Sequence, residues 1–180
     1  MKHLANLDDS NCKEVDMLES PFFSPEEIIT GLLATDVDRV LKAGSLVLAK
    51  AAGLPSEEIL KAVRESEKLG STANSAGVAI PHAFLRKLPE PLKLLILLRD
   101  PVIFNHDINV PVDVVIMLIW PTSRQNGFLP ALARHSRIFR DPELLARLRA
   151  ARDVTDVIVA LGDHSRGTPT VRSGQGLSLR

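Results

Sequence analysis

The chain is poor in cysteine and in aromatic residues, and both shortages limit what it can be. Its 180 residues include one cysteine, Cys12, one tryptophan and no tyrosine, and aromatic residues make up only 4% of the chain. A single cysteine excludes an internal disulfide and is compatible with a reducing cytosol. Stability must therefore come from an aliphatic core, and with 45% hydrophobic residues the chain can bury one core of substantial size.

Neither sign of charge is in excess. Lysine plus arginine and aspartate plus glutamate each count 22, so the formal net charge is zero. Without a broad basic field, nucleic acid and anionic membranes are poor candidates for main partners. The longest apolar runs, Leu94–Leu98 and Val114–Trp120, fall far short of the ~20 residues that span a bilayer and are predicted to be buried strands. Asp8 and Asp9 stand where a secretory signal would be apolar, so we expect a cytoplasmic protein without membrane insertion.

Motifs for nucleotides and metals are also missing. Neither G-x-x-x-x-G-K-[ST] nor G-x-G-x-x-G occurs, and the five histidines are dispersed without H-x-x-x-H or C-x-x-C spacing. His106 and Asp107 lie in a predicted loop, where turn chemistry explains them, although with His82 they could in principle bind a metal. We therefore expect no cofactor and no metal.

Hydrophobic periodicity predicts one α/β domain, a single mixed sheet of about five strands covered by helices on both faces. The domain spans 22–162, between a mobile N-terminal segment, 1–21, and a flexible C-terminal tail, 163–180. Ser56 is predicted to open a helix with a capping box, and Asp141-Pro142-Glu143 is predicted to open another. Strands are predicted near 27–33, 77–81, 92–98, 102–104 and 112–120, and helices near 35–52, 56–68, 127–139, 142–151 and 153–161.

One histidine follows a short apolar strand. The run Val78–Ile80 predicts a buried strand that Pro81 ends, so we expect His82 at a strand-to-loop edge where pairing stops. Ser71–Thr72 and Gly77 can bring hydroxyls and backbone N–H groups close to the ring. An imidazole with such donors can carry a transient phosphoryl group, because the ring nitrogen attacks and the donors hold the phosphoryl oxygens. A structural histidine bonded to a backbone carbonyl is the alternative.

The segment Ser66–Thr72, with the run Gly77–His82 after it, resembles the active-site signature of the fructose/mannitol-type (type-2) IIA domains of the bacterial phosphoenolpyruvate-dependent sugar phosphotransferase system. The nitrogen-regulatory branch is the most similar. Ile28–Leu33, Pro111–Pro121 and Leu129–Leu148 extend the similarity over roughly 22–162. The resemblance implies that His82 accepts a phosphoryl group on its tele nitrogen from an HPr-type phosphocarrier protein. It implies that His82 then passes the group to a sugar permease domain or holds it as a regulatory mark.

Two positions depart from the family pattern. Ser66 stands where the family usually has an arginine, and Arg64, two positions away, points to another side of a helix. A serine in place of that arginine reduces the stabilisation of the transition state by ~2–4 kcal/mol. Phe128 replaces a second histidine and offers only an apolar face. His135 lies about 10 Å further along the same helix at ~1.5 Å per residue, so it cannot replace that ring.

Two functions remain open. The first is a regulatory protein of the nitrogen-regulatory type that transfers phosphoryl groups weakly and binds a partner protein through the surface around His82. Phe128 is then an exposed contact residue, unless it is core packing. The alternative is an active phosphocarrier that accepts phosphoryl groups from an HPr-type protein for sugar uptake or signalling, with Ser71 and Thr72 in place of the missing arginine. The resemblance to members that stand alone and bind target proteins favours the first.

Overall fold

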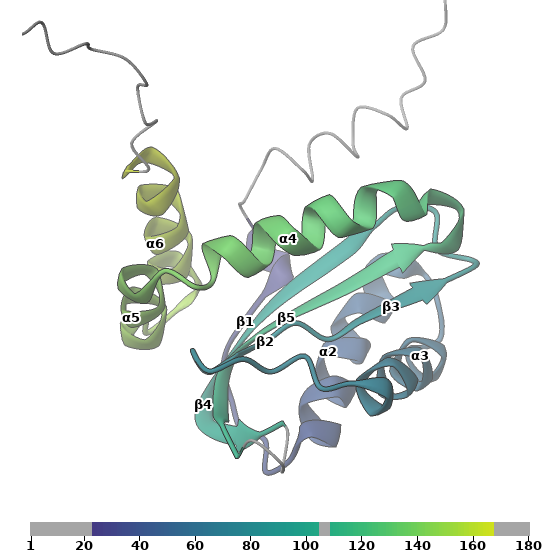
Figure 1. The fold of residues 1–180 in the computed structure, drawn as a ribbon, viewed down its shortest axis with the longest axis horizontal. Coiled ribbons are helices and arrows are strands. Elements are labelled where there is room, and N and C mark those ends of the chain that lie inside the picture. Colours follow the sequence, from purple (N-terminus) through teal and green to yellow (C-terminus); the bar gives the residue numbers. More distant parts are fainter. Residues whose placement is uncertain (1–22, 105–108, 168–180) are drawn as a thin grey trace, which may run out of the picture.

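The computed structural model describes residues 23–104 and 109–167. The predicted N-terminal segment, the loop with His106 and Asp107, and most of the predicted C-terminal tail lie outside the described residues. In chain order the elements are η1 (Pro25–Glu27), β1 (Ile28–Leu32), α2 (Val37–Ala52), α3 (Ser56–Leu69), β2 (Val78–Ala79), β3 (His82–Leu85), β4 (Leu92–Ile103), β5 (Pro111–Pro121), η2 (Thr122–Gly127), α4 (Phe128–Ile138), α5 (Pro142–Ala150) and α6 (Val154–Gly167) (Figure 1).

Five strands form one mixed sheet, which confirms the predicted α/β fold class. The order is β1-β4-β5, and β2 and β3 both pair with the far edge of β5. β4 and β5 are antiparallel, whereas β1 is parallel to β4, and β2 and β3 are parallel to β5. The strands predicted at 92–98 and 102–104 are a single strand, β4, whose register with β5 shifts between Leu97 and Val102. The prediction split β4 because its polar residues lie at this irregularity.

Helices cover both faces of the sheet (Figure 1). α2 and α3 pack together on one face, where the core includes Ile59 and Met117. The other face carries α4, α5 and α6, with Leu118 and Leu144 in its core. Because successive residues of a strand point to opposite faces, a central strand covered on both sides is apolar on both, as β5 is from Val114 to Pro121. Gly44 allows α2 to lie directly on Met117, since any added Cβ would overlap the Met117 sulfur.

One of two predicted helix starts is confirmed. Asp141 caps α5 by accepting a hydrogen bond from the Glu143 backbone N–H at 2.8 Å, with Pro142 in the first turn. The capping box predicted at Ser56 is wrong. Ser56 is already the first helical residue of α3, and Pro55 precedes it without any side-chain cap.

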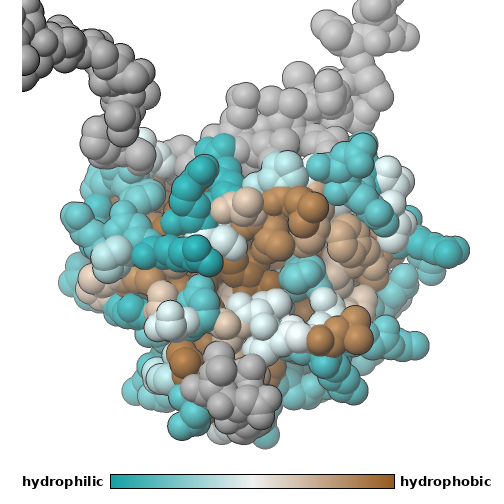
Figure 2. Space-filling view, viewed as in Figure 1, coloured by the Kyte–Doolittle hydropathy of each residue, from teal (hydrophilic) through white to brown (hydrophobic). Residues whose placement is uncertain are grey.

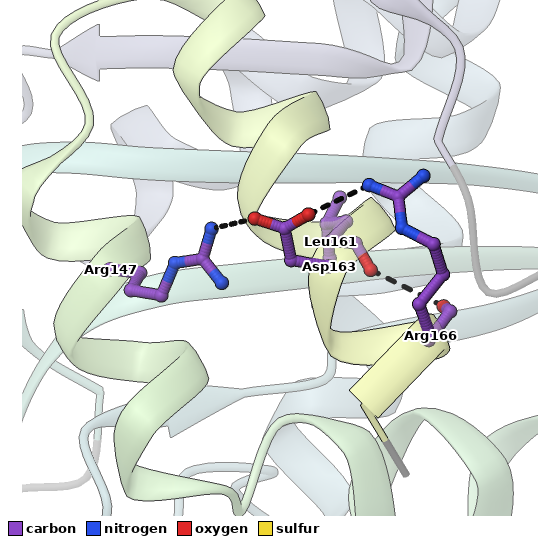
Figure 3. A network of polar contacts seen from close by, with 5 residues as sticks. Arg147, Leu161, Asp163 and Arg166 are labelled. Atoms are coloured by element: carbon purple, nitrogen blue, oxygen red, sulfur yellow. Dashed lines mark hydrogen bonds and ion pairs between the residues drawn. The ribbon is translucent and has the colours of Figure 1, made fainter.

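α6 continues past its predicted end at residue 161, so residues 163–167, assigned by the sequence analysis to the tail, are helical. Asp163 on this turn accepts hydrogen bonds from Arg147 of α5 at 2.6 Å and from Arg166 at 2.7 Å (Figure 3). The two guanidinium groups, Arg166 first, hold the pKa of Asp163 below its usual value. His164 Nδ1 lies 3.2 Å from Asp141 Oδ2. These contacts join the end of α6 to α5.

Candidate functional site

His82 is the first residue of β3, and strand pairing resumes at this residue. It is in register with Leu118 of β5, and Val78 of β2 is in register with Val114 with the same offset. β2 and β3 are therefore one strand, interrupted because Pro81 has no N–H to donate. The expectation that pairing stops at His82 is wrong, since the Pro81 carbonyl still accepts from the Leu118 N–H at 3.0 Å. The imidazole is thus carried by a residue fixed within the sheet.

A backbone carbonyl determines which nitrogen of the His82 ring is available. Nδ1 lies 3.1 Å from the carbonyl oxygen of Ile80, and the ring is half-buried. Because a carbonyl only accepts hydrogen bonds, we assign the proton to Nδ1. This leaves the lone pair on Nε2, so the tele nitrogen is the nucleophilic atom of the neutral ring.

Phe128 covers His82 from the N-terminus of α4. The two ring centroids are 5.0 Å apart, and Phe84 and Trp120 complete an aromatic cluster around Phe128 at 4.8 and 5.8 Å. Phe128 is only 6% exposed, so the expectation that it is an exposed contact residue is wrong and its alternative, core packing, is correct. The exposed apolar residues nearby are Phe84, at 37%, and Leu129, at 69%.

The hydroxyl-bearing loop lies alongside the strand that leads to His82. An antiparallel bridge pairs Ala73 with Ala79, so the preceding residues run beside Ile80 and Pro81. Thr72 donates both its N–H and its hydroxyl proton to the Glu67 carboxylate, each at 2.9 Å. Both donors of Thr72 are occupied in this conformation, so its role as a donor to a phosphoryl group stays a prediction. Ser71 Oγ accepts a long bond of 3.4 Å from the Ala73 N–H, which leaves the hydroxyl proton of Ser71 to donate elsewhere.

Gly77, at the far end of the same loop, connects the loop to β5 through backbone hydrogen bonds. Its N–H donates to the Asn74 carbonyl at 3.2 Å, and its carbonyl accepts from the Asp113 N–H at 3.0 Å. Its φ of +80° lies in the left-handed region, which favours glycine. Because the N–H is occupied in this conformation, the donor role expected of Gly77 stays a prediction.

Arg64 does not replace the arginine missing at Ser66. Ser66 is half-buried in α3, and Arg64 forms a two-point ion pair with Asp38 of α2, in which Nη2 and Oδ2 are 2.6 Å apart. This pairing raises the pKa of Arg64 and lowers that of Asp38. Lys87, downstream of His82, lies 3.6 Å from Glu58. Arg64 is committed to α2, as its position two residues before Ser66 indicated.

His135 lies apart from His82, as the helical spacing predicted. It is 2% exposed, its Nδ1 donates to the Ala131 carbonyl at 2.8 Å, and its ring lies edge-on to Phe23 at 6.0 Å. Nε2 has no hydrogen-bond partner within residues 23–104 and 109–167. Burial, together with the charge of the buried Lys93, lowers the pKa of His135 to about 4. Sequence reasoning missed this pair of buried basic residues, because it considered His135 only by its distance from Phe128 along the helix.

The part of the chain that the structure describes holds no group of three or more histidine, cysteine, aspartate or glutamate residues that could bind a metal ion. It also holds no helix long and apolar enough to cross a membrane.

Residues 21–163 match the family model described as phosphoenolpyruvate-dependent sugar phosphotransferase system, EIIA 2. The chain belongs to this family. A nitrogen regulatory protein of Bradyrhizobium diazoefficiens is 33% identical over 138 residues, which are 77% of this chain and 90% of the relative. The resemblance inferred from the signature is thereby confirmed.

Solved structures support the EIIA type-2 fold. The nitrogen regulatory protein IIA-Ntr of Neisseria meningitidis superposes with a TM-score of 0.72 at 23% identity, covering 77% of this chain and 94% of that one. Enzyme IIA mannitol of Escherichia coli, solved in complex with phosphorylated enzyme IIB mannitol, gives 0.67 at 16% identity, covering 78% and 97%. At these identities the likeness concerns the fold alone.

The site of this EIIA type-2 chain thus combines a poised nucleophile with few donors. Nε2 of His82 carries a lone pair, whereas Thr72 and Gly77 have used their donors within the loop. Ser66 offers at most one neutral hydroxyl bond, and Phe128 excludes water without stabilising an anion.

Proposed function

We propose that this chain is a regulatory EIIA protein of the nitrogen-regulatory type, in which His82 accepts a phosphoryl group slowly from an HPr-type phosphocarrier and the protein acts by binding a target protein. The observation that carries the proposal is the Nδ1–H bond to the Ile80 carbonyl, which a structural histidine would also make but which leaves the Nε2 lone pair as the nucleophile. Exchange with an HPr-type carrier places this function in the cytoplasm.

In the proposed transfer, the ring of His82 forms one bond to phosphorus as the donor loses one. The Nε2 lone pair forms a bond to phosphorus while the bond from phosphorus to the donor breaks, and that electron pair returns to the donor. The ring gains positive charge in this step. The Ile80 carbonyl stabilises that charge through the Nδ1 proton, because a hydrogen bond from a charged donor is stronger than one from a neutral donor.

The shortage of donors supports slow transfer. Three equatorial oxygens carry charge in the transition state of phosphoryl transfer. The hydroxyl proton of Ser71 is available to them, but those of Thr72 are bound to Glu67. Loss of a charged donor at Ser66 costs ~2–4 kcal/mol, which is a factor of roughly 30 to 1,000 in rate.

The surface around His82 suits a protein partner. Phe84 on β3 and Leu129 on α4 are large apolar residues that remain exposed. Figure 2 shows apolar surface gathered over the part of the molecule where β3 and α4 lie, with polar surface around it. An apolar patch with a polar rim is typical of protein–protein contacts.

The alternative function, a fully active phosphocarrier for sugar uptake or signalling, is supported by the same free Nε2. The two differ in rate and in what the phosphoryl group does next. A carrier passes it on quickly, whereas a regulator keeps it and changes its affinity for a target.

Intact mass spectrometry tests the proposal directly. The purified protein is incubated with phosphoenolpyruvate, enzyme I and an HPr-type carrier, with a known EIIA domain as positive control and His82→Ala as negative control. We expect one added phosphoryl group, formed at least about tenfold more slowly than on the control domain and absent from His82→Ala. A rate equal to that of the control domain would support the active carrier. No modification of this chain, while the control domain is modified, would refute phosphoryl transfer altogether.

A further inference from the structure

The loop before His82 is held at both ends. Near its start, Glu67 of α3 binds Thr72, and at its tip the Asn74 side chain accepts from the Ala76 N–H at 2.9 Å. The return limb then enters β2 and continues to His82 in one register. The position of Asn74–Gly77 therefore fixes both the segment that leads to His82 and the segment that carries Ser71.

The tip is bound by an arginine of a distant helix. Arg149, in the last turn of α5, donates to both carboxylate oxygens of Asp113, at 2.7 and 2.8 Å, and to the Ala76 carbonyl at 2.8 Å. Asp113 in turn donates its N–H to the Gly77 carbonyl. One guanidinium thus joins α5, the beginning of β5 and the tip of the loop. The Asp113 carboxylate raises the pKa of Arg149, as a bidentate pair does.

Gly77 makes room for this contact. A Cβ built on Gly77 would lie 2.8 Å from Arg149 Nη2, closer than a Cβ approaches other atoms in real structures. The same Cβ would lie 3.2 Å from the Pro111 carbonyl. The positive φ and the close approach both require glycine here, and together they show that the guanidinium is fitted against the loop backbone.

We propose that Arg149 is a positioning residue for phosphoryl transfer at His82: its contacts with Asp113 and Ala76 fix the loop so that Ser71 meets the incoming phosphoryl group in a productive geometry. This inference rests on the proposed function. Because the site has few donors, correct placement of the remaining ones matters more than it would beside an arginine. A displacement of about 1 Å can cost up to 10²-fold in rate.

Arg147 provides a matched control on the same helix. It also donates to a carboxylate at 2.6 Å, and its side chain is exposed to 37%, close to the 40% of Arg149. Its partner is Asp163 of α6, so Arg147 has no described contact with the loop. Arg147→Ala therefore removes a comparable ion pair and one positive charge from α5 without releasing the loop.

The test compares Arg149→Ala, Arg149→Lys and Arg147→Ala with the wild-type chain. Single-turnover transfer from phosphorylated HPr-type carrier is measured at increasing carrier concentration, which separates the transfer rate at saturation from the half-saturating concentration. Urea unfolding shows what fraction of each variant is folded. Hydrogen exchange of the amides of residues 72–78 reports the loop independently of phosphoryl transfer.

We expect Arg149→Ala to lower the saturating rate about tenfold, with a half-saturating concentration within about twofold of the wild type. The loop amides should exchange faster in this variant, and Arg147→Ala should change neither quantity. Arg149→Lys should remain slow, because a lysine keeps the charge but cannot make the three contacts. Full rescue by lysine, or equal slowing by Arg147→Ala, would overturn the inference while leaving the proposed function intact. A wild-type chain that accepts no phosphoryl group would instead overturn the proposed function.

Discussion

Acid should destabilise this protein through one buried histidine on α4. His135 has a pKa of about 4 when folded, against an ordinary value of 6.5. The unfolded chain therefore binds more protons between these two values, and the free energy of unfolding must fall as the pH drops from 6.5 towards 4. At pH 5 the loss is about 2 kcal/mol relative to pH 7.5, and it levels off near 3 kcal/mol below pH 4.

Replacing His135 by leucine isolates this contribution. Leucine does not titrate, and it removes a buried Nε2 atom that has no partner among the described residues. Urea unfolding of the wild-type chain and of His135→Leu at pH 7.5 and 5.0 measures the difference, and other titrating groups cancel between the two proteins. With a dependence of about 2 kcal/mol per M on urea, the wild-type midpoint should fall by roughly 1 M more than that of the variant.

The same pH dependence in both proteins would refute the assignment of a neutral, buried imidazole. Phe23 lies edge-on to the ring, and the charge of Lys93 repels a second positive charge there. A proton added to Nε2 of His135 would therefore be unfavourable in the folded protein. An NMR titration of the His135 ring in the folded protein gives a second reading, since no titration should occur above pH 5.

Three further predictions concern the site. Ser66→Arg combined with Phe128→His should speed phosphoryl transfer to His82 by about 30-fold or more. Single-turnover transfer from an HPr-type carrier measures this rate. An unchanged rate would show that the shortage of donors is not the cause of slow transfer. Glu67→Ala should lower the urea midpoint by the equivalent of about 1–2 kcal/mol, because both donors of Thr72 then lose their acceptor. Gly77→Ala should cost about 1–3 kcal/mol, because φ is +80° and Arg149 occupies the Cβ position; a stability within about 0.5 kcal/mol of wild type in urea unfolding would contradict this.

Much of the fold could be predicted because the strands and helices carry strong periodic patterns. The central strand β5 contains an unbroken apolar run from Val114 to Pro121, and Asp141 with Pro142 indicates where α5 begins. β3 was not predicted. Pro81 does break a hydrogen-bond ladder locally, but the register of β2 with β5 continues through it, and a register is a property of two strands together.

The candidate site was predicted in outline and not in its hydrogen bonds. The signature located His82 and the two unusual positions, Ser66 and Phe128. Which donors are free depends on where side chains such as Glu67 and Arg149 fold back, and these contacts join residues far apart in sequence. Arg149 lies 73 residues from Ala76, so no local pattern connects them.

The ion pairs at the end of α6 also affect how the protein should be shortened for experiments. The family match stops at residue 163, which invites a cut there. Such a cut would place a new carboxylate on Asp163 and remove the helical turn behind it, together with Arg166 and the contact of His164 with Asp141. Asp141 caps α5, so a chain cut at 163 should have a less stable α5, whereas a chain cut after Gly167 keeps these contacts.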